Sequence, residues 1–154
     1  MGLVKEVNEK VYKVIGLCME VHRTLGPGHP VSFYRKALEV ELALKELSFE
    51  AQKSVQVLYK DVLVGTLELD FIVEGEVIVV IRSQETLKDI EIQQVLRCLA
   101  LTGSTIGLLV NFGQVKVQYK RILPSYQRRE TRKEPYRTAA YREIGRTREG
   151  NPIM

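Results

Sequence analysis

The stretch "LDFIVEGEVIVVIRS", residues 69–83, decides the fold of this chain. It holds two runs of β-branched and other apolar residues, separated by the short polar segment "EGE" at residues 74–76. Such runs are typical of β-strands, and a short turn containing glycine joins antiparallel neighbours. We therefore predict a buried β-hairpin, with Asp70 in its first strand and Arg82 at the end of its second.

The segments around this hairpin alternate between helical and strand patterns. Helical spacing of apolar residues predicts a first helix that ends near Thr24, before "LGPGHP", and a second helix over about residues 31–47. Helical spacing returns in "LKDIEIQQVLRCLALTG", and the predicted strands are "SVQVLYK", "VLVGTLELDFIV", "EVIVVIRS", "TIGLLVNFG" and "VKVQYKRI". A helix that crosses over between two strands makes them parallel, so the predicted fold class is α/β, with a mixed β-sheet flanked by helices.

Charge divides the chain into two parts near Pro124. The chain has 154 residues, 45% of them hydrophobic, which fits one globular domain. Residues 1–123 hold 15 basic and 15 acidic side chains, whereas residues 124–154 hold 8 basic and 4 acidic, so the net charge of +4 lies in the second part. That part has few aliphatic residues for a core. We predict a domain over residues 1–123 and a basic C-terminal extension over residues 124–154, disordered unless bound to a partner.

Several features favour a cytoplasmic location and no membrane insertion. No apolar run reaches the length needed to span a bilayer, and the N-terminus lacks a signal-peptide pattern. Cys18 and Cys98 stand in apolar-periodic segments without metal-ligand spacing. The pattern predicts two reduced, buried thiols, with a disulfide as the alternative.

Several segments together carry a family resemblance. They are the hairpin at 69–83, "VIGLCMEVHRTLGPG" at 14–28, "YRKALEVELALKEL" and "QQVLRCLALTGSTIGLLVNFG". In this order they resemble the GxxExxY proteins, small members of the PD-(D/E)XK nuclease superfamily, over roughly residues 9–123. The resemblance implies a nuclease-like fold and, in active members, metal-dependent cleavage of nucleic acid.

The resemblance assigns the superfamily's chemistry to a few positions. It places a metal-binding aspartate at Asp70, and the acid and lysine of the (D/E)XK triplet at Val80 and Arg82. The glutamine of the following helix is present as Gln94, while Cys98 stands at the tyrosine four residues later. The chain therefore departs from the family pattern where the reaction would occur.

The opening signature also departs from the family. Gly28 and Tyr34 match Gly-x-x-Glu-x-x-Tyr, but Val31 stands at the glutamate. Magnesium needs several hard oxygen ligands, and valine supplies none. Arginine at position 82 can hold a phosphate but cannot act as a base. We therefore expect no cofactor, no metal and a catalytically inactive, vestigial site of Asp70, Arg82 and Gln94.

Two interpretations of Asp70 remain open. Asp70 can form an ion pair with Arg82 across the hairpin, or remain a ligand for Mg²⁺ or Mn²⁺. The second needs a migrated acid, for which Glu91 and Glu85 are the candidates, because Glu91 shares a helix face with Gln94. This alternative function is an active, metal-dependent nuclease.

The extension offers a different signal, because arginines alternate with tyrosines. Arginine bonds phosphate and stacks on bases, and tyrosine stacks as well. The competing interpretation is a solvated tail without a partner. The candidate contacts to RNA or to a protein surface are Arg128, Arg129, Arg132, Lys133, Tyr136, Arg137, Tyr141, Arg142, Arg146 and Arg148. We predict an inactive nuclease-fold protein that acts as a binding or structural subunit of a larger assembly containing RNA.

Overall fold

The computed structural model describes residues 2–124, with side chains from Lys5 onward. Residues 125–154 of the extension, with all ten of its predicted contact residues, lie outside this range. The elements are α1 (Gly2–Leu25), α2 (Val31–Leu44), β1 (Phe49–Tyr59), β2 (Val62–Val73), β3 (Val77–Arg82), α3 (Asp89–Thr102), β4 (Ile106–Asn111) and β5 (Gln118–Ile122). None of these helices has the length and apolarity needed to span a membrane.

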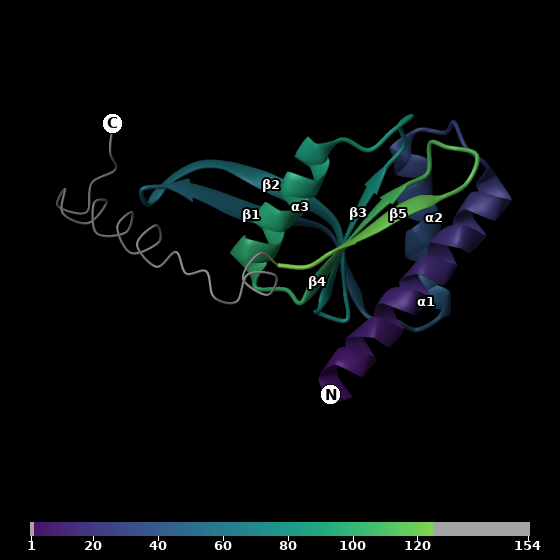
Figure 1. The fold of residues 1–154 in the computed structure, drawn as a ribbon, viewed down its shortest axis with the longest axis horizontal. Coiled ribbons are helices and arrows are strands. Elements are labelled where there is room, and N and C mark those ends of the chain that lie inside the picture. Colours follow the sequence, from purple (N-terminus) through teal and green to yellow (C-terminus); the bar gives the residue numbers. More distant parts are fainter. Residues whose placement is uncertain (1, 125–154) are drawn as a thin grey trace.

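The five strands form one sheet whose order, β1-β2-β3-β4-β5, is also their order in the sequence. Strands β3 and β4 are parallel, with Val77 opposite Ile106, and every other pair is antiparallel. Helix α3 connects the two parallel strands, so the predicted mixed α/β sheet is confirmed (Figure 1).

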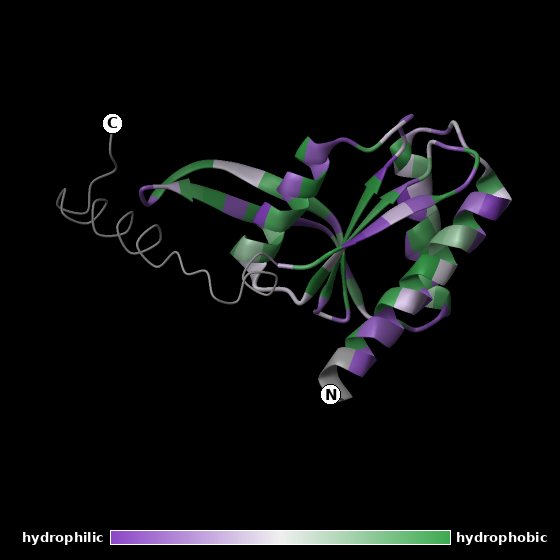
Figure 2. Ribbon diagram, viewed as in Figure 1, coloured by the Kyte–Doolittle hydropathy of each residue, from purple (hydrophilic) through white to green (hydrophobic). Residues whose placement is uncertain are grey.

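Helices cover both faces of the sheet, with α1 and α2 on one side and α3 on the other (Figure 1). Strand β3 shows how the sequence produces a sheet that is covered on both faces. Val77, Val79 and Ile81 pack in the core beneath α1 and α2, whereas Ile78 and Val80 pack in the core beneath α3. Successive side chains point to opposite faces, so a strand buried on both sides is apolar along its length (Figure 2).

The prediction of the turn between β2 and β3 is confirmed, but the predicted end of the second helix is not. Glu74 and Gly75 have φ values of 54° and 68°, which confirms a tight turn between β2 and β3 of the kind that favours antiparallel pairing. The prediction of a second helix to residue 47 is wrong, because α2 ends at Leu44. The positive φ of Glu46, 59°, is not helical, so α2 cannot continue through this residue. Leu47 follows the end of the helix and packs against the core from the loop.

The β1–β2 hairpin extends beyond the rest of the sheet (Figure 1). Strand β1 pairs with β2 along nearly its whole length, but β3 pairs only with residues 71–73 of β2. Residues 53–70 therefore project past β3. Near the tip, Leu58 and Leu63 face each other across the strands and are 54% and 52% exposed.

Candidate functional site

Asp70 is a buried carboxylate whose two oxygens both accept hydrogen bonds. Arg35 of α2 donates from Nε to Oδ1 at 2.7 Å, and the backbone N–H of Ile81 donates to Oδ2 at 2.7 Å. The side chain of Asp70 is only 9% exposed. The predicted ion pair between Asp70 and Arg82 is wrong, because the cation beside Asp70 comes from α2.

Strand β2 is irregular at Asp70, which explains how a residue of the sheet reaches α2. Leu69 and Ile72, three positions apart, both pack in the core beneath α3. Regular alternation would put them on opposite faces. On β1, Gln52 lies between Ala51 and Lys53, which pair with Phe71 and Leu69, and it has a φ of 52°. This distortion lies where β2 separates from β3.

Arg82, at the end of β3, is held by residues of α3 instead. Its Nη2 donates to Oε1 of Gln94 at 3.4 Å, and its Nη1 donates to the carbonyl of Ile81 at 2.9 Å. Its Nε lies 3.8 Å from Oε2 of Glu91. The structure therefore brings Arg82, Gln94 and Glu91 together, while Asp70 has a different ion-pair partner.

Glu91 stabilises the start of α3. Its Oε1 accepts the backbone N–H of Lys88 at 2.8 Å, and its Oε2 accepts a hydrogen bond from the Gln84 amide. A carboxylate in this position satisfies a free N–H of the first turn and interacts favourably with the helix dipole. Glu85, the other candidate acid, is exposed.

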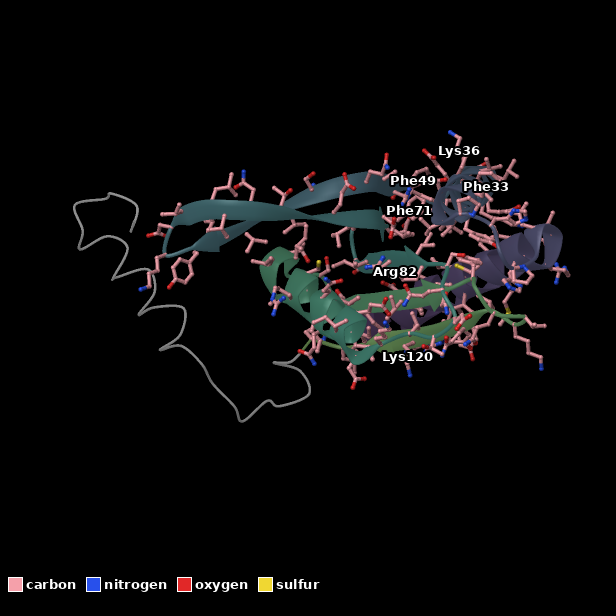
Figure 3. The ribbon with its side chains drawn as sticks, turned by 90° about the horizontal axis from the view of Figure 1, so that it is seen from above. Phe33, Lys36, Phe49, Phe71, Arg82 and Lys120 are labelled. Carbon is pink, nitrogen blue, oxygen red and sulfur yellow. The ribbon has the colours of Figure 1, made fainter. Side chains whose placement is uncertain are left out.

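A cavity of about 210 Å³ lies between β2, β3 and α3. Four of its lining residues are positions to which the family resemblance assigned chemistry, namely Val80, Arg82, Gln94 and Cys98. The others are Thr66, Leu67, Glu68, Leu69 and Val95. In Figure 3, Arg82 lies near the centre of the molecule, between the β1–β2 hairpin and the remaining strands.

Two residues of this region were missed at the level of sequence. Arg35 follows the signature residue Tyr34 directly, but nothing local indicates that it would reach a strand 35 positions later. Glu68 lies two positions before Asp70 and has the pattern of an ordinary exposed strand residue. Neither residue type carries a signal without the tertiary arrangement.

The remaining signature residues support the loop between α1 and α2. Gly28 has a φ of 95°, which favours glycine. The fully buried Tyr34 donates its hydroxyl hydrogen to the carbonyl of Gly26 and stacks on Phe112, with ring centroids 4.6 Å apart. Val31 is half-buried and packs against the core beneath α1 and α2.

Both cysteines are free and buried, as predicted. Burial raises the pKa of the Cys18 thiol to about 12. Burial also raises the pKa of Cys98, although the charges of Arg97 and Arg82 act in the opposite direction. Both thiols are therefore protonated, and weak as nucleophiles, at neutral pH.

This arrangement, a mixed sheet between helices with Asp70, Arg82 and Gln94 around one end of β3, is that of a nuclease-fold domain. The sequence pattern of the PD-(D/E)XK nuclease superfamily matches residues 8–122, and the chain belongs to this superfamily. Searches of curated proteins and of solved structures returned no match.

Proposed function

We propose that this chain is a member of the GxxExxY branch of the superfamily that no longer cleaves nucleic acid and acts as a binding subunit of a larger assembly containing RNA. The observation that carries the loss of cleavage is the ion pair between Arg35 and Asp70. The guanidinium supplies, from within the chain, the positive charge that a metal ion would otherwise supply to this carboxylate.

The donors near Asp70 fit a divalent metal poorly. Val80 offers no oxygen, and both oxygens of Asp70 and of Glu91 already have partners in the protein. Within residues 2–124, no three His, Cys, Asp or Glu side chains gather as a cation site would need. Magnesium binding would have to displace Arg35 from a buried carboxylate, which costs several kcal/mol.

The binding half of the proposal depends on the extension. Residues 1–123 carry no net charge, so their long-range attraction for phosphate is weak. The seven arginines and one lysine of residues 124–154 supply the positive charge, and the tyrosines supply surfaces for stacking. Affinity for RNA should therefore reside in the extension.

Cleavage assays test the proposed loss of nuclease activity. The full chain is incubated with labelled single-stranded and duplex DNA and RNA, with Mg²⁺ or Mn²⁺, beside the Asp70→Asn variant as a matched control. We expect the two proteins to give the same background. Cleavage by the unmodified chain that is lost in Asp70→Asn would overturn the proposal.

Salt titration tests the proposed binding of RNA by the extension. Binding of single-stranded RNA to the full chain is followed by fluorescence anisotropy, and each phosphate contact should contribute a log–log slope of about −0.7. With roughly four contacts the slope should be near −3. Replacing Arg128, Arg129 and Arg132 by Gln should weaken binding and flatten the slope. A flat salt response, with binding lost in Tyr136→Ala and Tyr141→Ala but kept in the arginine variants, would favour a protein partner.

One observation favours the alternative of an active nuclease, namely the proximity of Arg82, Gln94 and Glu91. In this alternative Glu91 would replace the lost acid and hold Mg²⁺ or Mn²⁺ together with Asp70. Its test is cleavage that depends on Mn²⁺ and disappears in Glu91→Ala but persists in Glu85→Ala.

A further inference from the structure

The charges of the folded domain are unevenly placed, although they balance overall. Residues 1–91 hold 11 basic and 15 acidic side chains, whereas residues 92–124 hold four basic side chains and no acidic one. The four are Arg97, Lys116, Lys120 and Arg121. Two of them belong to the edge strand β5, and Lys120 lies on the opposite side of the molecule from the β1–β2 hairpin (Figure 3). A local positive field of this kind attracts polyanions even where the net charge is zero.

Tyr12 of α1 and Tyr119 and Arg121 of β5 lie together on one face of the sheet. The β4 partners of the two β5 residues, Val110 and Leu108, pack in the core beneath α1 and α2. Paired residues of neighbouring strands point to the same face, so both β5 side chains project on the side of α1. There the guanidinium carbon of Arg121 lies 5.2 Å from the centre of the Tyr12 ring, which is a cation–π contact. We call these three residues the β5 surface.

The three side chains of the β5 surface are accessible to a ligand. Tyr12 is 69% exposed and Tyr119 is 40% exposed, and Arg121 is exposed as well. Within residues 2–124, Arg121 has no carboxylate partner. Its N–H groups can therefore bind a phosphate while one face of the guanidinium rests on the Tyr12 ring.

Exposed aromatic rings beside a free guanidinium are groups that proteins use to bind single-stranded nucleic acid. Bases of any identity stack on tyrosine, and a basic groove follows the phosphates. Tyr119 and Arg121 are alternate residues of one strand, about 6.8 Å apart. Successive bases stacked in a duplex strand are only ~3.4 Å apart. Bases bound along β5 must therefore be unstacked from each other, which costs least in an unpaired strand.

We propose that the β5 surface binds unpaired RNA without base specificity, by stacking on Tyr12 and Tyr119 and by contact of Arg121 with phosphate. The inference rests on the proposed function, because it names the part of the folded domain that contacts the RNA held by the extension. The extension follows β5 directly in the sequence. The β5 surface and the extension can therefore bind consecutive parts of one strand.

A single tryptophan reports on this surface, because the chain has none of its own. In the full-length Tyr12→Trp variant, a single-stranded oligonucleotide of uridine should quench the fluorescence, since a base stacks on the indole ring. An RNA duplex of the same length and poly-glutamate should leave the fluorescence unchanged. The matched control is Tyr59→Trp at the tip of the β1–β2 hairpin, where Tyr59 is 51% exposed. Its fluorescence should not respond to the oligonucleotide.

Affinity of the full chain for the same oligonucleotide, followed by fluorescence anisotropy, separates ring from charge. Tyr119→Ala should weaken binding about tenfold, whereas Tyr119→Phe keeps the ring and should bind as the unmodified chain does. Arg121→Gln should weaken binding and reduce the log–log salt slope by about 0.7. Lys53→Gln on β1, at the opposite edge of the sheet, is the charge control and should change neither quantity.

Several results would overturn the β5 surface as an RNA site. They are quenching of Tyr59→Trp as strong as that of Tyr12→Trp, equal quenching by duplex RNA, and indifference of affinity to Tyr119→Ala. Quenching by poly-glutamate but not by RNA would assign the surface to an acidic protein partner instead. Fluorescence that changes with protein concentration alone would assign it to a second copy of the chain.

Replacing Arg128, Arg129 and Arg132 by Gln separates this inference from the proposed function. Binding that is lost in the triple variant but unaffected by Tyr119→Ala refutes the β5 surface only. Binding that is lost in Tyr119→Ala but unaffected in the triple variant refutes RNA binding by the extension only. No binding by the unmodified chain refutes both.

Discussion

Arg35 and Asp70 form an ion pair that joins α2 to β2, at the residue for which the family resemblance predicts a metal ligand. The side chain of Asp70 is 9% exposed and that of Arg35 is 26% exposed. The pair is therefore largely shielded from water. The pair gives the buried carboxylate of Asp70 a cation from within the fold, so its removal should lower the stability of the domain.

Replacing Arg35 by Met should lower the free energy of unfolding by about 3 kcal/mol, because it leaves a buried carboxylate without its cation. Urea denaturation at neutral pH measures this. Lys36→Met is the matched control, since Lys36 on the same helix has a side chain that is 78% exposed, and it should change stability little.

Adding Asp70→Asn to Arg35→Met should recover part of the loss, because the neutral amide can still accept the N–H of Ile81. A coupling energy of about 1–3 kcal/mol in the double-mutant cycle is expected. Equal destabilisation by Arg35→Met and Lys36→Met would show that the ion pair contributes nothing.

Metal binding should require more than restoration of the triplet. Calorimetry with Mn²⁺ should detect no tight site in the unmodified chain. Val80→Glu with Arg82→Lys should improve binding, and adding Arg35→Met should improve it further by freeing Oδ1 of Asp70. Tight binding by the unmodified protein that is abolished by Glu91→Ala would contradict this interpretation.

Val31→Glu should destabilise the domain by roughly 1–3 kcal/mol, although it restores the glutamate of the signature. Val31 packs against the core, so the new carboxylate would lose part of its hydration without gaining a partner. Ser32→Glu, one position later and exposed, is the control. An unchanged melting temperature for Val31→Glu at neutral pH would show that this position admits water freely.

Cys18 should make the domain less stable in alkali. Burial raises its pKa from the ordinary value of 9.0 to about 12, so the folded state keeps a proton that the unfolded state releases. The contribution is therefore intact below pH 9 and is lost as pH rises toward 12, by up to about 1.4 kcal/mol per pH unit.

Urea denaturation between about pH 8 and 10.5 measures this slope. Cys18→Ala should reduce it, whereas Val14→Ala, which creates a comparable cavity on the same helix, should leave it unchanged. The same slope in both variants would mean that other groups cause the loss of stability in alkali.

The strands and the connection through α3 could be predicted because their signals are local. Strand β3 is apolar at every position from Val77 to Ile81, and the glycine turn before it fixes the pairing with β2. The contact between Arg82 and Gln94 could also have been predicted, because the end of β3 lies near the helix that follows it in the chain. The end of α2 was mispredicted because Leu47 extends the apolar pattern although it packs from beyond the helix.

The pairing of Arg35 with Asp70 could not be predicted in this way. It depends on an irregularity in β2 that no residue type marks, and on how α2 lies against the sheet. Asp70 was expected to face Arg82 because both belong to one hairpin, but Glu91 holds Arg82 and Arg35 holds Asp70. Long-range electrostatic pairing is a property of the assembled layers, so the hairpin sequence alone does not give the partners of Asp70 and Arg82.

Every strand of the sheet lies beside the strand that precedes it in the chain. The antiparallel pairs β1–β2, β2–β3 and β4–β5 close through short connections, which cost little loop-closure entropy, whereas β3 reaches β4 only through the longer crossover that contains α3. During synthesis each new strand, from β2 to β5, meets a partner that has already been made. Few strand edges therefore wait unpaired, which limits the time in which the chain can associate wrongly with another copy.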